Sequence, residues 1–169
     1  MPPPFSSNQY KDYIISKYKK NILEAVKNIP CRGQFKYTAS NQFAFIELDN
    51  EFGWKSYNVL KEENFKIRWT IKKHRFPACH VSLMLPDEYK TVPLSMLDSI
   101  RKEMKDQVFE LQIVDVRMIQ HTEKTTKDIY WLVSLVVKAE ILSILRKMMK
   151  LKDKENYNPH ATVCEYKLE

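Results

Sequence analysis

The sequence predicts an α+β domain with a pseudo-twofold arrangement, in which strand-and-helix units recur on either side of residue 105. Two observations predict this class. Apolar residues alternate along several short runs, as in half-buried strands, and recur every three or four residues along others, as in helices. A tripeptide of histidine, an apolar residue and a hydroxyl residue also occurs once in each half, at His80-Val81-Ser82 and His160-Ala161-Thr162. The halves share negligible identity, so the repeat rests on pattern alone.

The N-terminal part is expected to contain a leader, a helix and an edge strand. Residues 1–8, with three consecutive prolines, are expected to be a disordered leader, and 9–169 a single domain. Within 9–38, a helix is predicted through about residue 28, followed by a possible strand at 34–38. The helix is predicted from apolar residues at helical spacing, namely Tyr10, Ile14, Tyr18, Ile22, Val26 and Ile29.

The rest of the domain is predicted to form two lobes, 42–105 and 106–169. In the first lobe, the expected elements are strands at 42–48, 65–71 and 79–85 and helices within 49–63 and at about 93–104. In the second lobe, they are a hairpin of strands 108–120 and 128–137, a helix at about 138–150 and a strand at 160–164.

Composition limits the classes of protein to which the chain can belong. At 169 residues, with 44% hydrophobic and 29% charged residues, the chain is an ordinary globular protein. Its net charge of +7 favours a polyanionic partner such as RNA or an oligonucleotide. The only two glycines, Gly33 and Gly53, exclude Rossmann and P-loop nucleotide sites, which need glycine clusters near phosphate.

Cysteine content and hydropathy bear on the compartment. The three cysteines form no CxxC pair, which fits a reducing compartment better than a disulfide framework. No apolar run approaches the length of a membrane span, and the N-terminus lacks a signal-peptide pattern. We therefore expect a monomer in the cytoplasm, with the nucleus as the alternative, and no membrane partner.

The two tripeptides are the candidate catalytic motifs. Side chains two apart on a strand point to the same face, so His80 lies beside Ser82 and His160 beside Thr162. One such match has almost no value as a motif. Here both matches fall in strand-like runs that follow a proline-containing loop, and the other two histidines, His74 and His121, do not match the tripeptide.

Paired imidazoles and hydroxyls suit the cleavage of a phosphodiester. An unperturbed histidine titrates at about 6.5, so one imidazole can accept a proton from the attacking hydroxyl or water while the other donates one to the leaving oxygen. The hydroxyls of Ser82 and Thr162 would bind the non-bridging phosphate oxygens. This chemistry needs neither a metal nor a cofactor, and it leaves open which histidine is the acid.

A zinc site and a Ser/His/Asp triad are the alternatives to this site. A zinc site could use His80, His160 and Cys164, since unbroken alternation would put Cys164 on the face of His160. The spacing matches no known zinc pattern, and hydroxyls beside each histidine do not suit such a site. A Ser/His/Asp triad lacks a nucleophile elbow.

The chain resembles the two-histidine (2H) phosphoesterase superfamily over about residues 42–166. The resemblance is carried by 43–48, by Lys66-Ile67-Arg68-Trp69-Thr70, and by the two tripeptides with their following Leu83 and Val163. It implies a bilobal fold in which two antiparallel sheets flank a central groove, with helices outside. It also implies metal-independent action on 2′-5′ or 2′,3′-cyclic phosphodiester bonds of RNA or oligonucleotides, including 2′-5′-oligoadenylate, with His80, Ser82, His160 and Thr162 as catalytic residues.

The chain departs from the superfamily at two places. Relatives usually continue with a further hairpin after the second motif, whereas seven residues follow Thr162 here. Either 9–38 supplies the missing edge or the lobe is trimmed. The first motif has Ser82 where many relatives have threonine, and the hydroxyl is retained.

Substrate-binding residues are expected in the loops before the motifs. Tyr157 could stack on a base, and Arg75 and Lys73 could contact phosphate, although each also fits an ordinary loop residue. The alternative functions are a catalytically inactive RNA-binding module and a protein-interaction scaffold on the same fold.

Overall fold

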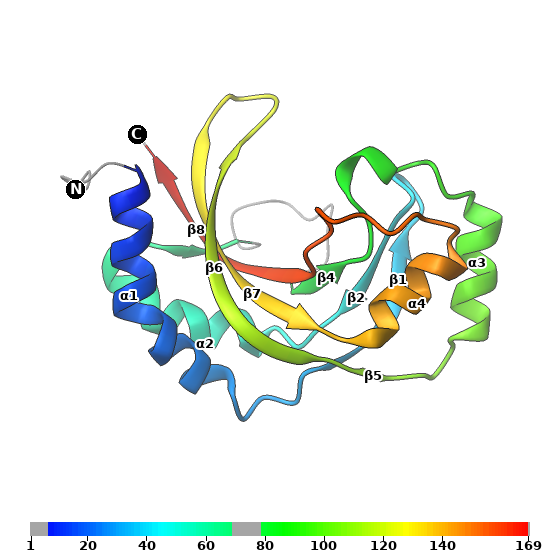
Figure 1. Cartoon of the computed structure of the whole chain (residues 1–169), viewed down its shortest axis with the longest axis horizontal. Coiled ribbons are helices and arrows are strands. Elements are labelled where there is room, and N and C mark those ends of the chain that lie inside the picture. The colour runs from blue at the N-terminus through cyan, green and yellow to red at the C-terminus, as the bar shows by residue number, and fades with distance from the viewer. Residues whose placement is uncertain (1–6, 69–78, 169) are drawn as a thin grey trace.

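The computed structural model describes residues 7–68 and 79–168, which form two four-stranded antiparallel sheets with four α-helices (Figure 1). This arrangement confirms the predicted bilobal α+β class. Helices α1 (Ser7–Val26) and α2 (Glu51–Leu60) lie at one end of the molecule. Helices α3 (Leu94–Glu103) and α4 (Glu140–Met148) lie at the other.

The first sheet has the strand order β4-β2-β1-β5. Its members are β4 (His80–Ser82), β2 (Phe43–Glu47), β1 (Arg32–Thr38) and β5 (Phe109–Glu110). The expected edge strand within 9–38 is therefore wrong, because β1 pairs with β2 on one side and β5 on the other.

The second sheet has the order β3-β8-β7-β6. Its members are β3 (Lys66–Ile67), β8 (His160–Leu168), β7 (Ile129–Lys138) and β6 (Gln112–Thr122). The predicted hairpin is β6 and β7, the long curved pair in Figure 1. Strand β3, and not the N-terminal strand, covers the outer side of β8.

The two sheets do not divide the chain at one position. Strand β3 precedes the first motif but joins the second sheet, and β5 follows residue 105 but joins the first. Two short 3-10 helices, η1 (Lys61–Glu63) and η2 (Pro86–Glu88), follow α2 and the first motif. Residues 69–71 of the predicted strand 65–71 lie outside the described residues.

The core lies between the helices and one face of each sheet. The predicted apolar stripe of α1 is buried, from Tyr10 to Val26, and α1 begins at Ser7, two residues earlier than expected. Tyr10 packs against Trp131 of β7 and Tyr166 of β8. The helix thus covers the apolar face of the second sheet, and the opposite face is left for polar side chains.

No helix within 7–68 and 79–168 is long and apolar enough to cross a membrane.

Candidate active site

The first motif presents its polar side chains on one face of β4. Val81 and Leu83 are fully buried, whereas His80 and Ser82 are partly exposed. This alternation confirms the predicted strand geometry. Strand β4 pairs with β2, so that Glu47 lies opposite His80.

Aromatic rings of β2 orient the His80 imidazole. The rings of Phe43 and Phe45 each lie 5.6 Å from it, centroid to centroid, in edge-to-face geometry. Such edge-to-face contacts fix the plane of a ring without using its nitrogens for hydrogen bonds. The packing therefore restricts how the His80 ring can turn.

The hydroxyl of Ser82 forms hydrogen bonds with the backbone of Met84, two residues later in the same turn. Its Oγ donates a hydrogen bond to the carbonyl oxygen of Met84 at 2.6 Å and accepts one from the Met84 N–H at 3.1 Å. This local turn shapes the chain after the motif. To donate to a phosphate, the Ser82 hydroxyl would have to rotate away from Met84.

The second motif shows the same alternation on β8. Ala161 and Val163 are fully buried, and His160 and Thr162 are partly exposed. Thr162 lies opposite Ser134 of β7, and their hydroxyl oxygens are 3.1 Å apart. A second hydroxyl therefore lies beside the predicted one.

The His160 ring is held through Nδ1. This nitrogen lies 2.7 Å from the carbonyl oxygen of Asn158 and 2.8 Å from Nη2 of Arg117 on β6. Burial lowers the pKa of His160 below its usual 6.5; the Asn158 carbonyl opposes the shift, and the Arg117 charge adds to it. Nε2 is left as the nitrogen that can exchange a proton with a ligand.

A β-bulge changes the face on which the end of β8 presents its side chains. Cys164 lies opposite Val133 and Thr162 opposite Ser134, so β8 has one extra residue at Val163. The extra residue moves Cys164 to the buried face and brings Glu165 to the face of Thr162. The expectation that Cys164 shares a face with His160 is therefore wrong.

Without Cys164 on that face, the zinc alternative loses a ligand. Within the described ranges, no group of three or more histidine, cysteine, aspartate or glutamate side chains is placed to hold a metal ion.

Glu165 forms an ion pair with Arg68, the residue after β3. Its side chain is only 3% exposed, and the Arg68 backbone N–H donates to the Val163 carbonyl at 3.2 Å. The pair holds the end of the Arg68 segment against the bulge. It also places a guanidinium on the face that carries the second motif.

The two motif strands lie against each other, although they belong to different sheets (Figure 1). Tyr157 joins them, because its hydroxyl donates to the Ser82 carbonyl oxygen at 2.9 Å. The Arg146 guanidinium lies over the Tyr157 ring, 4.4 Å from its centroid. Tyr157 thus positions the loop before the second motif, and stacking of a base on its ring stays a prediction.

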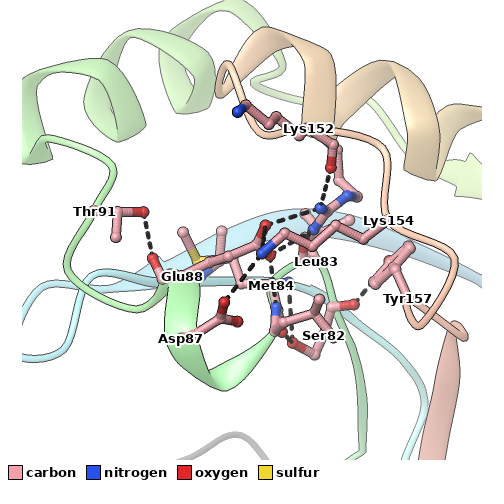
Figure 2. A network of polar contacts seen from close by, with 12 residues as sticks. Ser82, Leu83, Met84, Asp87, Glu88, Thr91, Lys152, Lys154 and Tyr157 are labelled. Carbon is pink, nitrogen blue, oxygen red and sulfur yellow. Dashed lines mark hydrogen bonds and ion pairs between the residues drawn. The ribbon is translucent and has the colours of Figure 1, made fainter.

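A buried ion pair between Arg146 and Glu88 fixes this junction; Figure 2 shows Glu88 in its polar network with Leu83 and Lys152 nearby. Arg146 of α4 is 1% exposed and donates to both carboxylate oxygens of Glu88, at 2.8 and 3.0 Å. Arg146 also donates to the carbonyl oxygens of Leu83 and Lys152, at 2.8 and 2.7 Å. One side chain therefore binds the segment after the first motif and the segment leading to the second.

The structure brings together most of the residues that the sequence singled out. His80, Ser82, His160 and Thr162 lie on the two neighbouring strands, with Tyr157 between them. Arg75 and Lys73 lie outside the described residues.

Sequence reasoning missed four polar residues that build or support the site, namely Arg117, Ser134, Arg146 and Glu165. Ser134 could have been noticed as a polar residue inside the largely apolar strand β7, whereas β6 carries other polar residues besides Arg117. Arg146 gave no such signal, because an arginine in the last turn of an amphipathic helix is typical of the helix surface, whereas the structure buries it.

Comparison with known proteins supports a family assignment. A family model described as Swiss Army Knife, 2H phosphoesterase domain, matches residues 45–167, well over half of the chain and both motifs. Among curated proteins and solved structures, none matches.

Proposed function

The chain belongs to the 2H phosphoesterase domain family, and we propose that it hydrolyses 2′-5′ or 2′,3′-cyclic phosphodiester bonds in RNA or oligonucleotides. The family supports phosphodiesterase-type, hydrolytic chemistry in general. The finer assignment to these bonds is the proposal. Its main support is the placement of two imidazole–hydroxyl pairs on adjoining strands of different sheets.

The surroundings of the histidines suggest their roles. His160 has a lowered pKa and is therefore neutral at neutral pH. With its proton on Nδ1 and bonded to the Asn158 carbonyl, Nε2 has a free lone pair and can accept a proton from the attacking hydroxyl or water. His80 is then the donor to the leaving oxygen.

Hydroxyl groups supply donors for the phosphate oxygens. The hydroxyl oxygens of Thr162 and Ser134 lie 3.1 Å apart, and Ser134 is fully buried, so Ser134 can donate to Thr162 while the partly exposed Thr162 donates to the phosphate. Ser82 is available once it leaves the Met84 carbonyl. Hydrogen bonds that strengthen as charge develops on the phosphate would lower the barrier.

The chain's net charge of +7 supports a polyanionic substrate such as RNA. We further propose that the protein acts as a monomer and that its reaction needs no metal ion. The experiment below tests the second point directly.

The test is an assay with EDTA present. Wild type is incubated with 2′-5′-oligoadenylate and with an RNA ending in a 2′,3′-cyclic phosphate, and products are separated by chromatography. His80→Ala and His160→Ala should each lower the rate by about 10²–10⁴-fold, the usual contribution of an acid or base. His121→Ala, which changes a histidine of the β6–β7 hairpin, is the matched control and should retain the rate.

If wild type and the two motif variants behave alike on both substrates, the enzyme proposal is rejected. Salt-sensitive RNA binding without turnover would identify the inactive RNA-binding alternative. If the protein neither binds RNA nor turns over either substrate, the protein-interaction scaffold is the remaining alternative.

A further inference from the structure

Arg117 projects from β6 onto the face that carries the second motif. It lies opposite Ser134 of β7, which in turn lies opposite Thr162 of β8. Residues directly opposite one another on neighbouring strands share a face. Arg117, the two hydroxyls and His160 therefore form one polar group, with Arg117 Nη2 at 2.8 Å from His160 Nδ1.

Arg117 has no carboxylate partner among the ion pairs of the described residues. Asp115, two residues earlier on the same strand, is bound to Lys19 at 2.5 Å and accepts the Val116 N–H at 2.9 Å. The Nε of Arg117 is buried and has no hydrogen-bond partner within the described part of the chain. By contrast, Arg68 and Arg146 each face a glutamate.

A partly buried guanidinium without a counter-ion favours the binding of an anion. Arginine is always charged, and its planar fork of donors matches the oxygens of a phosphate. Burial lowers the pKa of Arg117, which reflects the cost of keeping this charge among protein atoms. A phosphate placed near Thr162 would lower that cost and receive the unused donors.

The contacts of His160 Nδ1 cannot both be made at once. The Arg117 guanidinium only donates, and the Asn158 carbonyl only accepts. A neutral imidazole carries one proton, so Nδ1 either accepts from Arg117, with the proton on Nε2, or donates to Asn158, with Nε2 unprotonated. Only the second form can act as a general base at Nε2.

We propose that Arg117 binds the phosphate of the substrate and that this releases Nδ1 of His160 to bond with Asn158. Without an anion, Arg117 holds His160 in the Nε2–H form, which cannot accept a proton there. When the guanidinium turns to phosphate, Nε2 loses its proton to water and Nδ1 gains one from water. The imidazole is neutral before and after, and no other reactant is needed.

The inference rests on the proposed function, because it assigns a phosphate substrate to this site. It adds that phosphate binding itself prepares the base. Besides Arg117, the sheet face of His160 carries Asp115, which lies opposite Val136 as His160 does and is paired with Lys19, and His80 lies on the adjoining β4. Arg117 contacts the ring of His160 directly.

Nitrogen NMR of His160 tests the inference without any turnover. At about pH 8, where histidine is neutral, the free wild type should show the Nε2–H form, and added inorganic phosphate should convert it to the Nδ1–H form. Arg117→Gln should show the Nδ1–H form with or without phosphate. Arg101→Gln, at an exposed arginine of α3 paired with Asp98, should behave as wild type.

Kinetics gives the second readout. Arg117→Gln should raise KM about tenfold or more, as expected for the loss of a charged hydrogen bond. Arg117→Lys keeps the charge but not the fork, and should fall between wild type and Arg117→Gln at an unchanged thermal midpoint. The lysine variant also serves if Arg117→Gln fails to fold.

The inference is overturned if free wild type already holds the Nδ1–H form, or if Arg117→Gln keeps the wild-type KM and kcat. Absence of hydrolysis by wild type would instead contradict the proposed function. In that case, the NMR experiment still decides the role of Arg117.

Discussion

At the scale of single residues, His160 shows how the surroundings of one side chain set its chemistry. We expect its pKa to lie below the usual 6.5, because burial and then the Arg117 charge disfavour the imidazolium more than the Asn158 carbonyl favours it. A proton NMR titration of the folded protein and of the urea-unfolded chain measures both values.

The sign of the shift also fixes an effect on stability. Since the folded pKa is the lower one, the unfolded chain binds the proton first as pH falls, and the free energy of unfolding decreases below about pH 6.5. Arg117→Gln should raise the folded pKa. A folded pKa at or above the unfolded value would contradict this assignment.

The neighbours of Gly33 leave no space for a side chain at this position. A β-carbon there would lie 2.0 Å from the carbonyl oxygen of Glu47 on the paired strand, a backbone atom that cannot move aside. Gly33→Ala should therefore lower the free energy of unfolding by about 1–3 kcal/mol, as overpacking does. Chemical denaturation measures it, with exposed Gln34→Ala as control. Equal stability of both variants would refute the close approach.

The residue pairs of the two motifs were predictable because strand alternation is local. His80 with Ser82, and His160 with Thr162, share a face as expected, and the apolar residues between them are buried. The partner of His160 was not predictable. Arg117 is 43 residues away in sequence, and nothing local indicates which strand it faces.

At the scale of elements, the bulge in β8 interrupts the alternation of side chains between the two faces of the strand. Beyond the bulge, counting every second residue no longer predicts which side chains share a face. Up to Thr162 the alternation gives the correct face, and one extra residue at Val163 reverses it. Glu165 therefore reaches the polar face and Cys164 the core. Short strands raise a related difficulty: two-residue β3 carries too little pattern to reveal that it pairs with β8.

The Arg68–Glu165 pair should be the main polar link between β3 and β8. Arg68→Met leaves a nearly buried carboxylate without its cation, which should cost about 3 kcal/mol of unfolding free energy. Arg68→Met combined with Glu165→Leu should recover most of that loss, because no charge is left buried. Denaturant unfolding of the single and double variants measures the coupling.

Replacing Lys61 provides the control for that cycle, since it is an exposed residue of the nearby η1. Lys61→Met should change stability by less than about 0.5 kcal/mol. Additive effects of the two substitutions in the double variant would show that Arg68 and Glu165 do not interact.

At the scale of the whole molecule, the buried Arg146–Glu88 pair connects the two sheets and the two motifs. Arg146 comes from α4, after the β6–β7 hairpin, and Glu88 from η2, just after the first motif. Glu88 also accepts the Leu85 N–H at 2.8 Å. The overall class was predictable from the pattern of elements, but this junction was not, because a buried arginine resembles any helix-surface arginine in the sequence.

The Glu88 carboxylate should make the fold sensitive to acid. Burial raises the pKa of Glu88, but hydrogen bonds from Arg146 and the Leu85 N–H outweigh burial and hold it below its usual 4.5. The charged pair therefore stabilises the fold at neutral pH, and this stabilisation is lost as pH falls below about 4.5 and through the folded pKa.

Glu88→Gln tests this link between the sheets. At pH 7 the variant should lose about 3–5 kcal/mol of unfolding free energy, because Arg146 stays buried without its anion. The difference in unfolding free energy between the variant and wild type should shrink as pH is lowered toward 3, because the Glu88 carboxylate of wild type then becomes protonated. Asp87→Asn is the matched control: Asp87 is exposed and, among the described residues, its ion pair is with Lys154 at 3.0 Å, so its loss should cost less than about 1 kcal/mol. A gap that stays constant with pH would mean that the charge of Glu88 does not hold the two motifs together.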